Sequence, residues 1–170
     1  RIHSLKAEDK IIISKFNSLV KNVTIEFEKL HPHLATFALI NFWVNDLSRG
    51  YIQIVRDRIS DEDKKVKAVI KEVYVTILKL CAPIIPFVTE NIWQELKERK
   101  IVKEESVHLS SWPKADTKKI NKKLEEEFKN LFKIIENGLY NREIAKIGLK
   151  WPLKSADITA NFNINKEIKK

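Results

Sequence analysis

The sequence has 170 residues, of which 44% are hydrophobic, enough for one well-packed core and at most two domains. Lys and Arg exceed Asp and Glu by nine, and residues 117–150 carry nine basic and five acidic side chains, which indicates a polyanionic partner or a solvated surface. One cysteine and three glycines exclude a disulfide framework, a thiolate zinc site and a glycine-rich phosphate-binding loop.

The sequence also argues against a membrane protein, a secreted protein and a self-sufficient enzyme. No apolar run approaches the roughly 20 residues of a membrane-spanning helix, and the N-terminus lacks a signal-peptide profile. His31 and His33 have no third ligand nearby, so we expect no metal site, and no nucleophile–base pair marks a catalytic residue. The lone cysteine fits a reducing, cytoplasmic setting. The start at Arg1 and the lack of methionine lead us to expect a piece of a longer protein or a processed chain.

In chain order, the first expected element is a helix that opens at Glu8 and Asp9, two acids suited to a first helical turn. The dipeptide His31-Pro32 ends it, because proline disfavours helical backbone in the preceding residue. A second helix is expected over residues 34–59, as the central helix of a bundle. Its predicted core face comprises Leu34, Phe37, Ala38, Ile40, Val44, Leu47, Tyr51, Ile54 and Val55.

Three polar side chains of this second helix are spaced to form one row. Arg49, Gln53 and Arg56 are four and three residues apart, so they would stack on one face of an α-helix. Two guanidinium groups and an amide can bind phosphates and read the edges of bases. The alternative is a solvated face with ion pairs to Asp46 and Asp57.

The third expected helix begins with a capping box of Ser60 and Asp63. Pro83 and Pro86 break it, because proline lacks a backbone donor and clashes with the preceding turn. A fourth helix follows over about residues 87–99. Four side chains are expected to pack in the core: Trp43, Cys81, Trp93 and Trp112.

Residues 100–116 show no helical period. Residues 107–109 alternate like a short strand, and Trp112 beside Pro113 is predicted to anchor a turn. The next helix is expected from a cap at Asp116 or Thr117, with lysines on its outer face.

That last helix is expected to reach about residue 146, with a bend at Gly138. An extended segment follows from residue 147, and residues 161–170 are polar and expected to be frayed. Together, the low glycine content and the spacings of three and four predict an all-α helical bundle with a short extended C-terminal segment.

Four stretches resemble one protein family, in the family's order and over most of residues 10–155. Residues 46–58 read DLSRGYIQIVRDR, residues 80–93 read LCAPIIPFVTENIW, residues 106–113 read SVHLSSWP, and a basic helix end from Arg142 leads to WPL at residues 151–153. They resemble the anticodon-binding domain of class I aminoacyl-tRNA synthetases of the isoleucyl, valyl and leucyl group. The DLSR signature favours the isoleucyl member over the valyl one. Gly50 departs from the tryptophan common at that place, and Gly148 from a lysine.

The resemblance implies an anticodon-binding helical bundle over residues 1–153, with residues 154–170 beginning a following, truncated C-terminal region. The parent enzyme would join isoleucine to its tRNA using ATP with Mg²⁺, and Zn²⁺ is a further candidate cofactor. This chain lacks the ATP motifs of such enzymes, so we expect it to be non-catalytic and to hold no cofactor. Its expected partners are an isoleucine tRNA and the catalytic domain of the same protein.

Polar-face geometry within the matching stretches selects the candidate tRNA contacts. Trp151 has a second interpretation, as a packing anchor held by Pro152. A rival to the whole reading is a helical protein-interaction module without nucleic-acid binding; an exposed apolar groove would favour it. The candidate tRNA contacts are Arg49, Gln53, Arg56 and Arg58 on the central helix and Arg142, Lys146, Lys150 and Trp151 near the end of the bundle.

Overall fold

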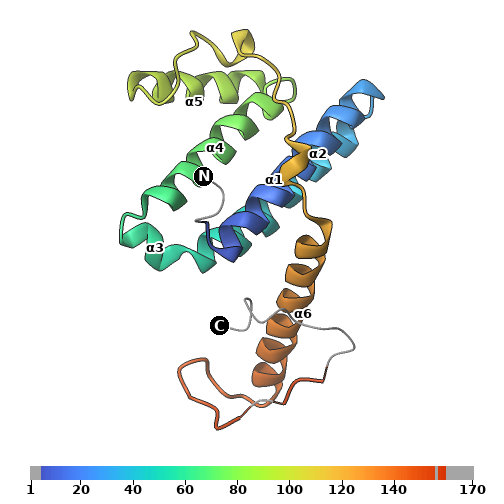
Figure 1. Cartoon of the computed structure of the whole chain (residues 1–170), viewed down its shortest axis with the longest axis vertical. Helices are drawn as coiled ribbons and strands as arrows, with labels where there is room; N and C mark the ends of the chain where they lie inside the picture. The colour runs from blue at the N-terminus through green and yellow to red at the C-terminus, as the bar shows by residue number, and fades with distance from the viewer. Residues whose placement is uncertain (1–4, 156, 160–170) are drawn as a thin grey trace. The chain divides into compact units, whose positions relative to one another are not determined.

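The computed structural model describes residues 5–155 and 157–159, and within them the chain is helical, with no β-strand (Figure 1). The predicted all-α class is therefore confirmed. The expectation for residues 161–170 lies outside the described residues. The elements are α1 (Ala7–Glu28), α2 (Pro32–Asn41), the π-helix η2 (Phe42–Ile52), α3 (Arg56–Ser60), α4 (Lys64–Cys81), α5 (Pro86–Glu98), the 3₁₀ turns η3 (Val107–Leu109) and η4 (Thr117–Lys119), and α6 (Lys122–Ile144).

The chain forms two compact units, Arg1–Ile120 and Asn121–Lys170. The family-domain boundary predicted after residue 153 stays a prediction. No helix of the described residues is long and apolar enough to cross a membrane.

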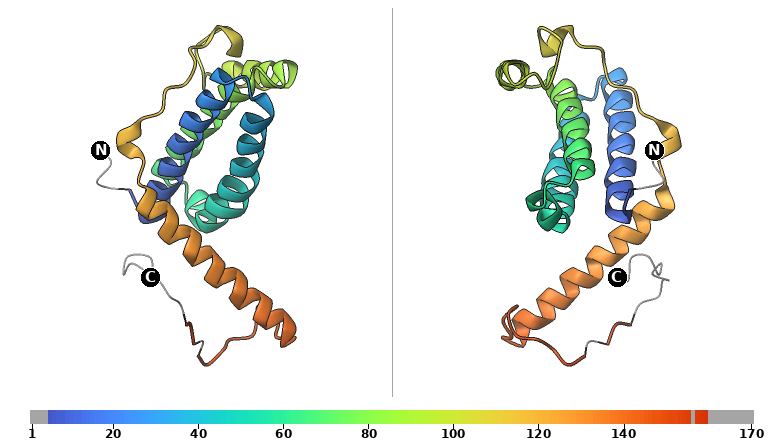
Figure 2. Two further views of the ribbon diagram at one scale, coloured as in Figure 1. Left: turned by 90° about the vertical axis from the view of Figure 1, so that its right-hand side faces the viewer. Right: turned by 60° about the vertical axis from the view of Figure 1, so that its left-hand side comes forward.

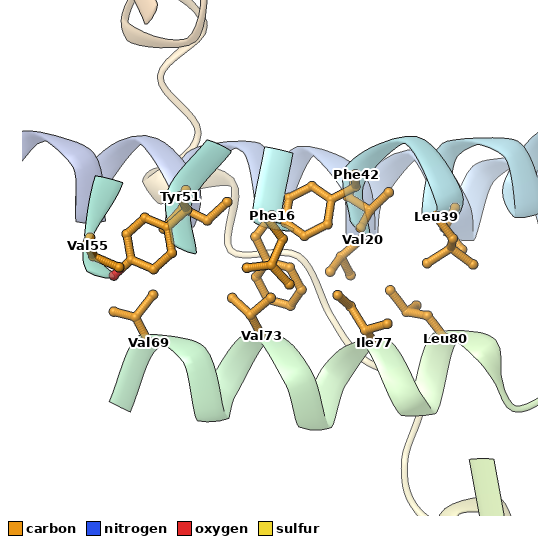
Figure 3. Close-up of a cluster of buried hydrophobic side chains, with 14 of the residues drawn as sticks. Phe16, Val20, Leu39, Phe42, Tyr51, Val55, Val69, Val73, Ile77 and Leu80 are labelled. Atoms are coloured by element: carbon orange, nitrogen blue, oxygen red, sulfur yellow. The ribbon is translucent and has the colours of Figure 1, made fainter. Parts of the chain in front are cut away.

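The core of the first unit lies between α1, the α2–η2 segment and α4, which run side by side (Figure 2). Figure 3 shows its centre, where side chains of α4 meet those of the other two elements. Each such side chain adds roughly 1.5–3 kcal/mol to folding through removal from water. The labelled members are Phe16, Val20, Leu39, Phe42, Tyr51, Val55, Val69, Val73, Ile77 and Leu80.

The core face predicted for the second helix is wrong at three positions of its first half, although Ala38 is partly buried against the core as predicted. Leu34, Phe37 and Ile40 are 45%, 73% and 58% exposed, and the buried positions there are Ala35, Leu39 and Phe42. In the second half the prediction is confirmed at Leu47, Tyr51 and Val55 but wrong at Ile54, which is also exposed.

The π-helix η2 explains why the predicted core face differs from the buried one in α2 but agrees with it at Leu47 and beyond. A π-helix places an extra residue in each turn, so it shifts the inward face along the sequence. The buried positions accordingly run from Phe42 to Leu47, a step of five. The prediction assumed α-helical spacing throughout and so began on the opposite apolar face. As a result, α2 exposes an apolar face as well as burying one.

Four helices end without glycine, which suits a chain that has only three. Leu30, Glu62, Lys100 and Lys146 have left-handed backbone, with φ between 54° and 59°. After α1, for example, the His31 amide donates to the Glu26 carbonyl and the Leu30 amide to the Phe27 carbonyl. The same pair of hydrogen bonds recurs at the other three ends, and together they satisfy the terminal carbonyls that a helix leaves unpaired.

The predicted helix break is confirmed, but the predicted caps are not. Helix α4 ends at Cys81 and α5 begins at Pro86. Asp63, rather than Ser60, caps α4, accepting a hydrogen bond from the Lys65 amide at 2.8 Å. The Ser60 hydroxyl instead donates to the Arg56 carbonyl.

The segment between α5 and α6 contains turns where a short strand was predicted. Residues 107–109 form the 3₁₀ turn η3, because the Ser106 hydroxyl caps it by accepting from the His108 amide. The anchoring role of Trp112 is confirmed, since its indole N–H donates to the Thr24 hydroxyl at 2.9 Å and its ring meets Phe27 edge-on.

The caps of the last helix also differ from the prediction. Asp116 caps only the short turn η4, whereas Asn121 caps α6, accepting from the Leu124 amide. Helix α6 remains α-helical through Gly138.

Of the three tryptophans assigned to the core, Trp93 is fully buried, but Trp43 and Trp112 are more than a third exposed. Cys81 is half-buried against the core, and this burial raises the pKa of its thiol.

Candidate nucleic-acid interface

Arg58, one of the predicted tRNA contacts, is not available to a ligand, because its guanidinium lies among three carboxylates. It donates to Glu8 at 2.8 Å, to both oxygens of Asp9 at 2.9 Å, and through Nε to Asp63 at 3.0 Å. Its side chain is 14% exposed and that of Asp9 is fully buried. Arg58 thus joins the first turn of α1 to α3 and to the cap of α4, which is a structural role.

Tyr51 completes this network from the π-helix. Its hydroxyl donates to Asp9 at 2.8 Å. Burial first, and then the hydrogen bond and charge of Asp9, raise the pKa of the Tyr51 hydroxyl well above its ordinary value. The hydrogen bond to Asp9 likewise raises the pKa of Arg58, although burial opposes this, so the tyrosine stays neutral and the arginine charged across the physiological range.

The other three candidates on this segment are free. Arg49, Gln53 and Arg56 are exposed, and the described residues give their side chains no hydrogen bond or ion pair. Arg49 lies on η2, Gln53 follows it, and Arg56 begins α3. Asp46, the alternative ion-pair partner, is instead paired with Lys15 of α1. Two guanidinium groups and an amide therefore face solvent on one short stretch, available to phosphates and base edges.

Two of the family-like motifs meet at Glu90 of α5. One carboxylate oxygen accepts from the Ser106 hydroxyl at 2.8 Å and the Val107 amide at 3.0 Å, and the other from the Gln94 amide at 2.6 Å. Burial alone would raise the pKa of Glu90, but these hydrogen bonds outweigh it and lower the pKa below the ordinary 4.5. Glu90 therefore holds the loop before η3 against α5.

Glu90→Gln should destabilise the chain by about 1 kcal/mol at pH 7, because hydrogen bonds to a charged acceptor are the stronger ones. A lowered carboxyl pKa in the folded state stabilises it above the unfolded value of 4.5, and that contribution is lost as the pH falls through the folded value. Urea unfolding from pH 7 to pH 3 should show the difference between the two proteins shrinking below about pH 4.5. The exposed Glu95→Gln is the matched control on the same helix, and a difference that stays constant with pH would contradict the assignment.

The remaining candidates belong to the second unit, where α6 ends. Arg142 donates through Nη2 to the carbonyls of Gly148 and Trp151, both at 2.6 Å, so it ties the turn after the helix back to α6. Lys146 and Lys150 are exposed. Trp151 is 71% exposed, and its role as a tRNA contact or a packing anchor stays a prediction.

Sequence reasoning missed the residues that support these side chains. Asp9 was identified only as a first-turn acid, and Glu90 and Ser106 only as letters within the family-like motifs. Asp9 and Arg58 are 49 residues apart and Glu90 and Ser106 are 16 apart, so local spacing did not connect them. Among the described residues, no group of three or more His, Cys, Asp or Glu side chains is placed to hold a metal ion.

Comparison with known proteins identifies the family of this chain. Residues 9–158 match the family model described as the anticodon-binding domain of tRNA ligase. A protein of Pyrococcus horikoshii named isoleucine–tRNA ligase is 35% identical over 98% of this chain and 16% of its own length. Proteins of the same name from Pyrococcus abyssi and Methanopyrus kandleri are each 39% identical over 88% of this chain and 14% of their own length.

The chain thus spans about one-sixth or less of the length of these relatives. The predicted resemblance to the isoleucyl enzymes is confirmed, and the valyl and protein-interaction alternatives are not favoured. The match includes Arg58 and its partners Asp9 and Asp63, the exposed Arg49, Gln53 and Arg56, and the end of α6. By its sequence and its all-helical fold, the chain belongs to the anticodon-binding domain family of tRNA ligases.

Proposed function

We propose that this chain binds a tRNA that accepts isoleucine, as the anticodon-recognising part of a cytoplasmic isoleucine–tRNA ligase. The observation that carries the proposal is the exposure of Arg49, Gln53 and Arg56, whose side chains have no partner among the described residues although neighbouring Arg58 is fully engaged. The names of the curated relatives support the choice of amino acid.

Two physical effects would produce binding. Exposed arginines and lysines displace counterions from the RNA backbone, which gives affinity that falls as salt rises. Unstacked bases are then held by stacking on aromatic rings or guanidinium planes and by hydrogen bonds at their edges. Arg49, Gln53 and Arg56 of the first unit and Lys146 and Trp151 of the second are placed on the surface for these roles.

Catalysis would belong to the rest of such a ligase. Activation of isoleucine with ATP and Mg²⁺, with Zn²⁺ as a further candidate cofactor, requires groups that this chain does not supply, so its own contribution is to bind and orient the tRNA. The catalytic domain is accordingly a proposed partner within the same protein.

The deciding experiment is a titration of this chain with an isoleucine tRNA transcript and with the same transcript carrying a swapped anticodon, at low and moderate salt. Tighter binding of the natural anticodon, weakening as salt rises, would support anticodon recognition. Equal, salt-dependent binding would reduce the role to backbone docking. Absence of binding at low salt would overturn the proposal.

Arg49→Ala and Arg56→Ala should each weaken tRNA binding by about ten-fold at low salt, equivalent to about 1.4 kcal/mol. If the side chain contacts a phosphate, the slope of log affinity against log salt should also fall by about one. Neither substitution should change the free energy of unfolding, because neither side chain has an internal partner in the described structure. Lys71→Ala, at an exposed position on α4, is the control, and an equal loss there would mean that only net charge matters.

A further inference from the structure

A pocket of about 340 Å³ opens on the first unit where its two hydrophobic clusters meet. Ile59 and Ile70 of its wall pack against the core around Phe16, and the other apolar side chains of the wall pack against the cluster of Trp93. The volume lies within the roughly 300–1,000 Å³ typical of small-ligand sites, and the roles assigned above leave it unused. The apolar wall comprises Ile59, Ile70, Tyr74, Val75, Leu96 and Ile101.

All six side chains of this wall are only half-buried, so apolar surface stays in contact with water at the pocket. A hydrocarbon ligand that covered this surface would gain affinity from its removal from water, roughly four-fold for each methylene group buried. The wall therefore favours an occupant with an aliphatic body.

Backbone hydrogen bonds hold the pocket open at both ends. Figure 1 shows α3 before the start of α4 and α5 after its end, and the wall draws on all three helices. Ile101 directly follows the left-handed Lys100, and its amide donates to the Leu96 carbonyl at 2.9 Å. In α3 the Ile59 carbonyl accepts from the amide of the left-handed Glu62 at 3.1 Å. Because the wall is preformed, a ligand would not have to order it.

The charged side chains of the lining are two lysines one turn apart on α4. Lys67 pairs with Glu62 at 3.1 Å, so its charge is already partly balanced. Lys71 is exposed, and the described residues give its ammonium no hydrogen bond or ion pair. No Asp or Glu belongs to the lining of this pocket in the described part of the chain. A ligand with a single negative charge complements this arrangement, whereas a phosphate monoester, with nearly two charges at pH 7, would stay partly unbalanced.

A neighbouring hollow of about 470 Å³ also contains Lys71 but differs in charge. Its lining includes Glu72 and Glu104, and a Glu104 oxygen lies 3.9 Å from the Lys79 ammonium. These carboxylates would repel an anion. The anionic group of a ligand is therefore better placed in the smaller, apolar pocket, on the Lys67 side of Lys71.

We propose that the smaller pocket binds a small, mainly hydrocarbon carboxylate. Its chain lies against the six apolar side chains, and its carboxylate meets the ammonium of Lys71, with a weaker attraction from Lys67. The site goes beyond tRNA binding, because Lys71 has no part in the proposed tRNA contacts.

The test is a two-dimensional NMR titration of the whole chain with three probes that share an eight-carbon chain: octanoate, 1-octanol and octyltrimethylammonium. We expect octanoate to bind about five-fold more tightly than octanol and the cation to bind most weakly. Hexanoate, two methylenes shorter, should bind about ten-fold more weakly than octanoate. The amide signals of Leu96 and Ile101 should move during the octanoate titration, and those of α6 should not.

Lys71→Met keeps an apolar stem but removes the charge. It should weaken octanoate binding about five-fold and leave octanol within two-fold of the parent. Lys21→Met, at an exposed position on α1, is the matched control and should leave octanoate binding unchanged. Circular dichroism would verify that both variants keep the helical content of the parent.

Three results would overturn the proposal. They are equal affinity for the anion, the alcohol and the cation, equal losses in Lys71→Met and Lys21→Met, and octanoate shifts that leave Leu96 and Ile101 unmoved. None of these results bears on the proposed function, which the tRNA titration tests separately.

Discussion

Replacement of Arg58 by methionine should lower the free energy of unfolding by about 3–5 kcal/mol, the range for removing one partner of a buried ion pair. The loss comes from what remains. Asp9 is fully buried, and without the guanidinium the donors left to its charge among residues 5–155 are neutral ones, the Tyr51 hydroxyl and the Lys6 amide. Urea unfolding followed by circular dichroism at pH 7 would measure it. Arg56→Met is the control, because that arginine lies two residues away and is exposed.

A second substitution tests the mechanism of this loss. Adding Asp9→Asn to Arg58→Met removes the stranded charge but keeps an acceptor for Tyr51, so the double variant should regain part of the lost stability. If the double variant is no more stable than the single one, the cost comes from lost packing rather than from an unpaired buried charge. If Arg58→Met matches Arg56→Met, the network does not stabilise the fold.

The helices were predictable because their signals are local. Pro83 and Pro86 lie in the sequence at the point where α4 gives way to α5, and the apolar spacing within α4 is regular enough to place Val69, Val73 and Ile77 in the core. Both signals act within one or two turns of helix, and in α4 the tertiary packing agrees with them.

The π-helix could not be predicted in the same way. The α2–η2 stretch has two apolar sides. One side follows an α-helical spacing from Leu34, and the other, which is the buried one, begins at Ala35. Only the packing against α1 and α4 selects the side that begins at Ala35. Helix propensity and apolar periodicity do not determine which of the two apolar faces is buried, because tertiary contacts determine it.

In the candidate site, too, some features were predictable from local sequence and others depend on tertiary contacts. Arg49, Arg56 and Arg58 are similar in sequence terms, yet two face solvent and one lies among carboxylates from residues 8, 9 and 63. The position of an arginine on a polar helix face does not show whether it is free, because that depends on which carboxylates the fold brings near it. The family resemblance identified this stretch, but Arg58, the residue in it with the most hydrogen bonds, stabilises the fold.

Trp93→Ala should destabilise the first unit by about 3–5 kcal/mol, the usual cost of truncating a large buried aromatic side chain. Trp93 is fully buried in a second cluster with Leu78, Ala82, Val102 and Val107. Its indole N–H donates to the Glu104 carbonyl at 3.0 Å, and the Lys79 ammonium lies 5.5 Å from its ring centre. Truncation removes the hydrogen bond, the contact with Lys79 and the packing of the ring, and it leaves a cavity.

Trp43→Ala is the matched control, since Trp43 is 39% exposed and its main aromatic contact is Tyr74. Its loss of stability should be about a third of that for Trp93→Ala or less. Hydrogen exchange should also show where the damage lies: because the second cluster is separate from the core around Phe16 and Val73, amides of α5 and of residues 101–107 should lose protection before those of α1. Uniform loss of protection over both clusters would mean instead that the first unit opens as one cooperative block, with Trp93 part of a single core.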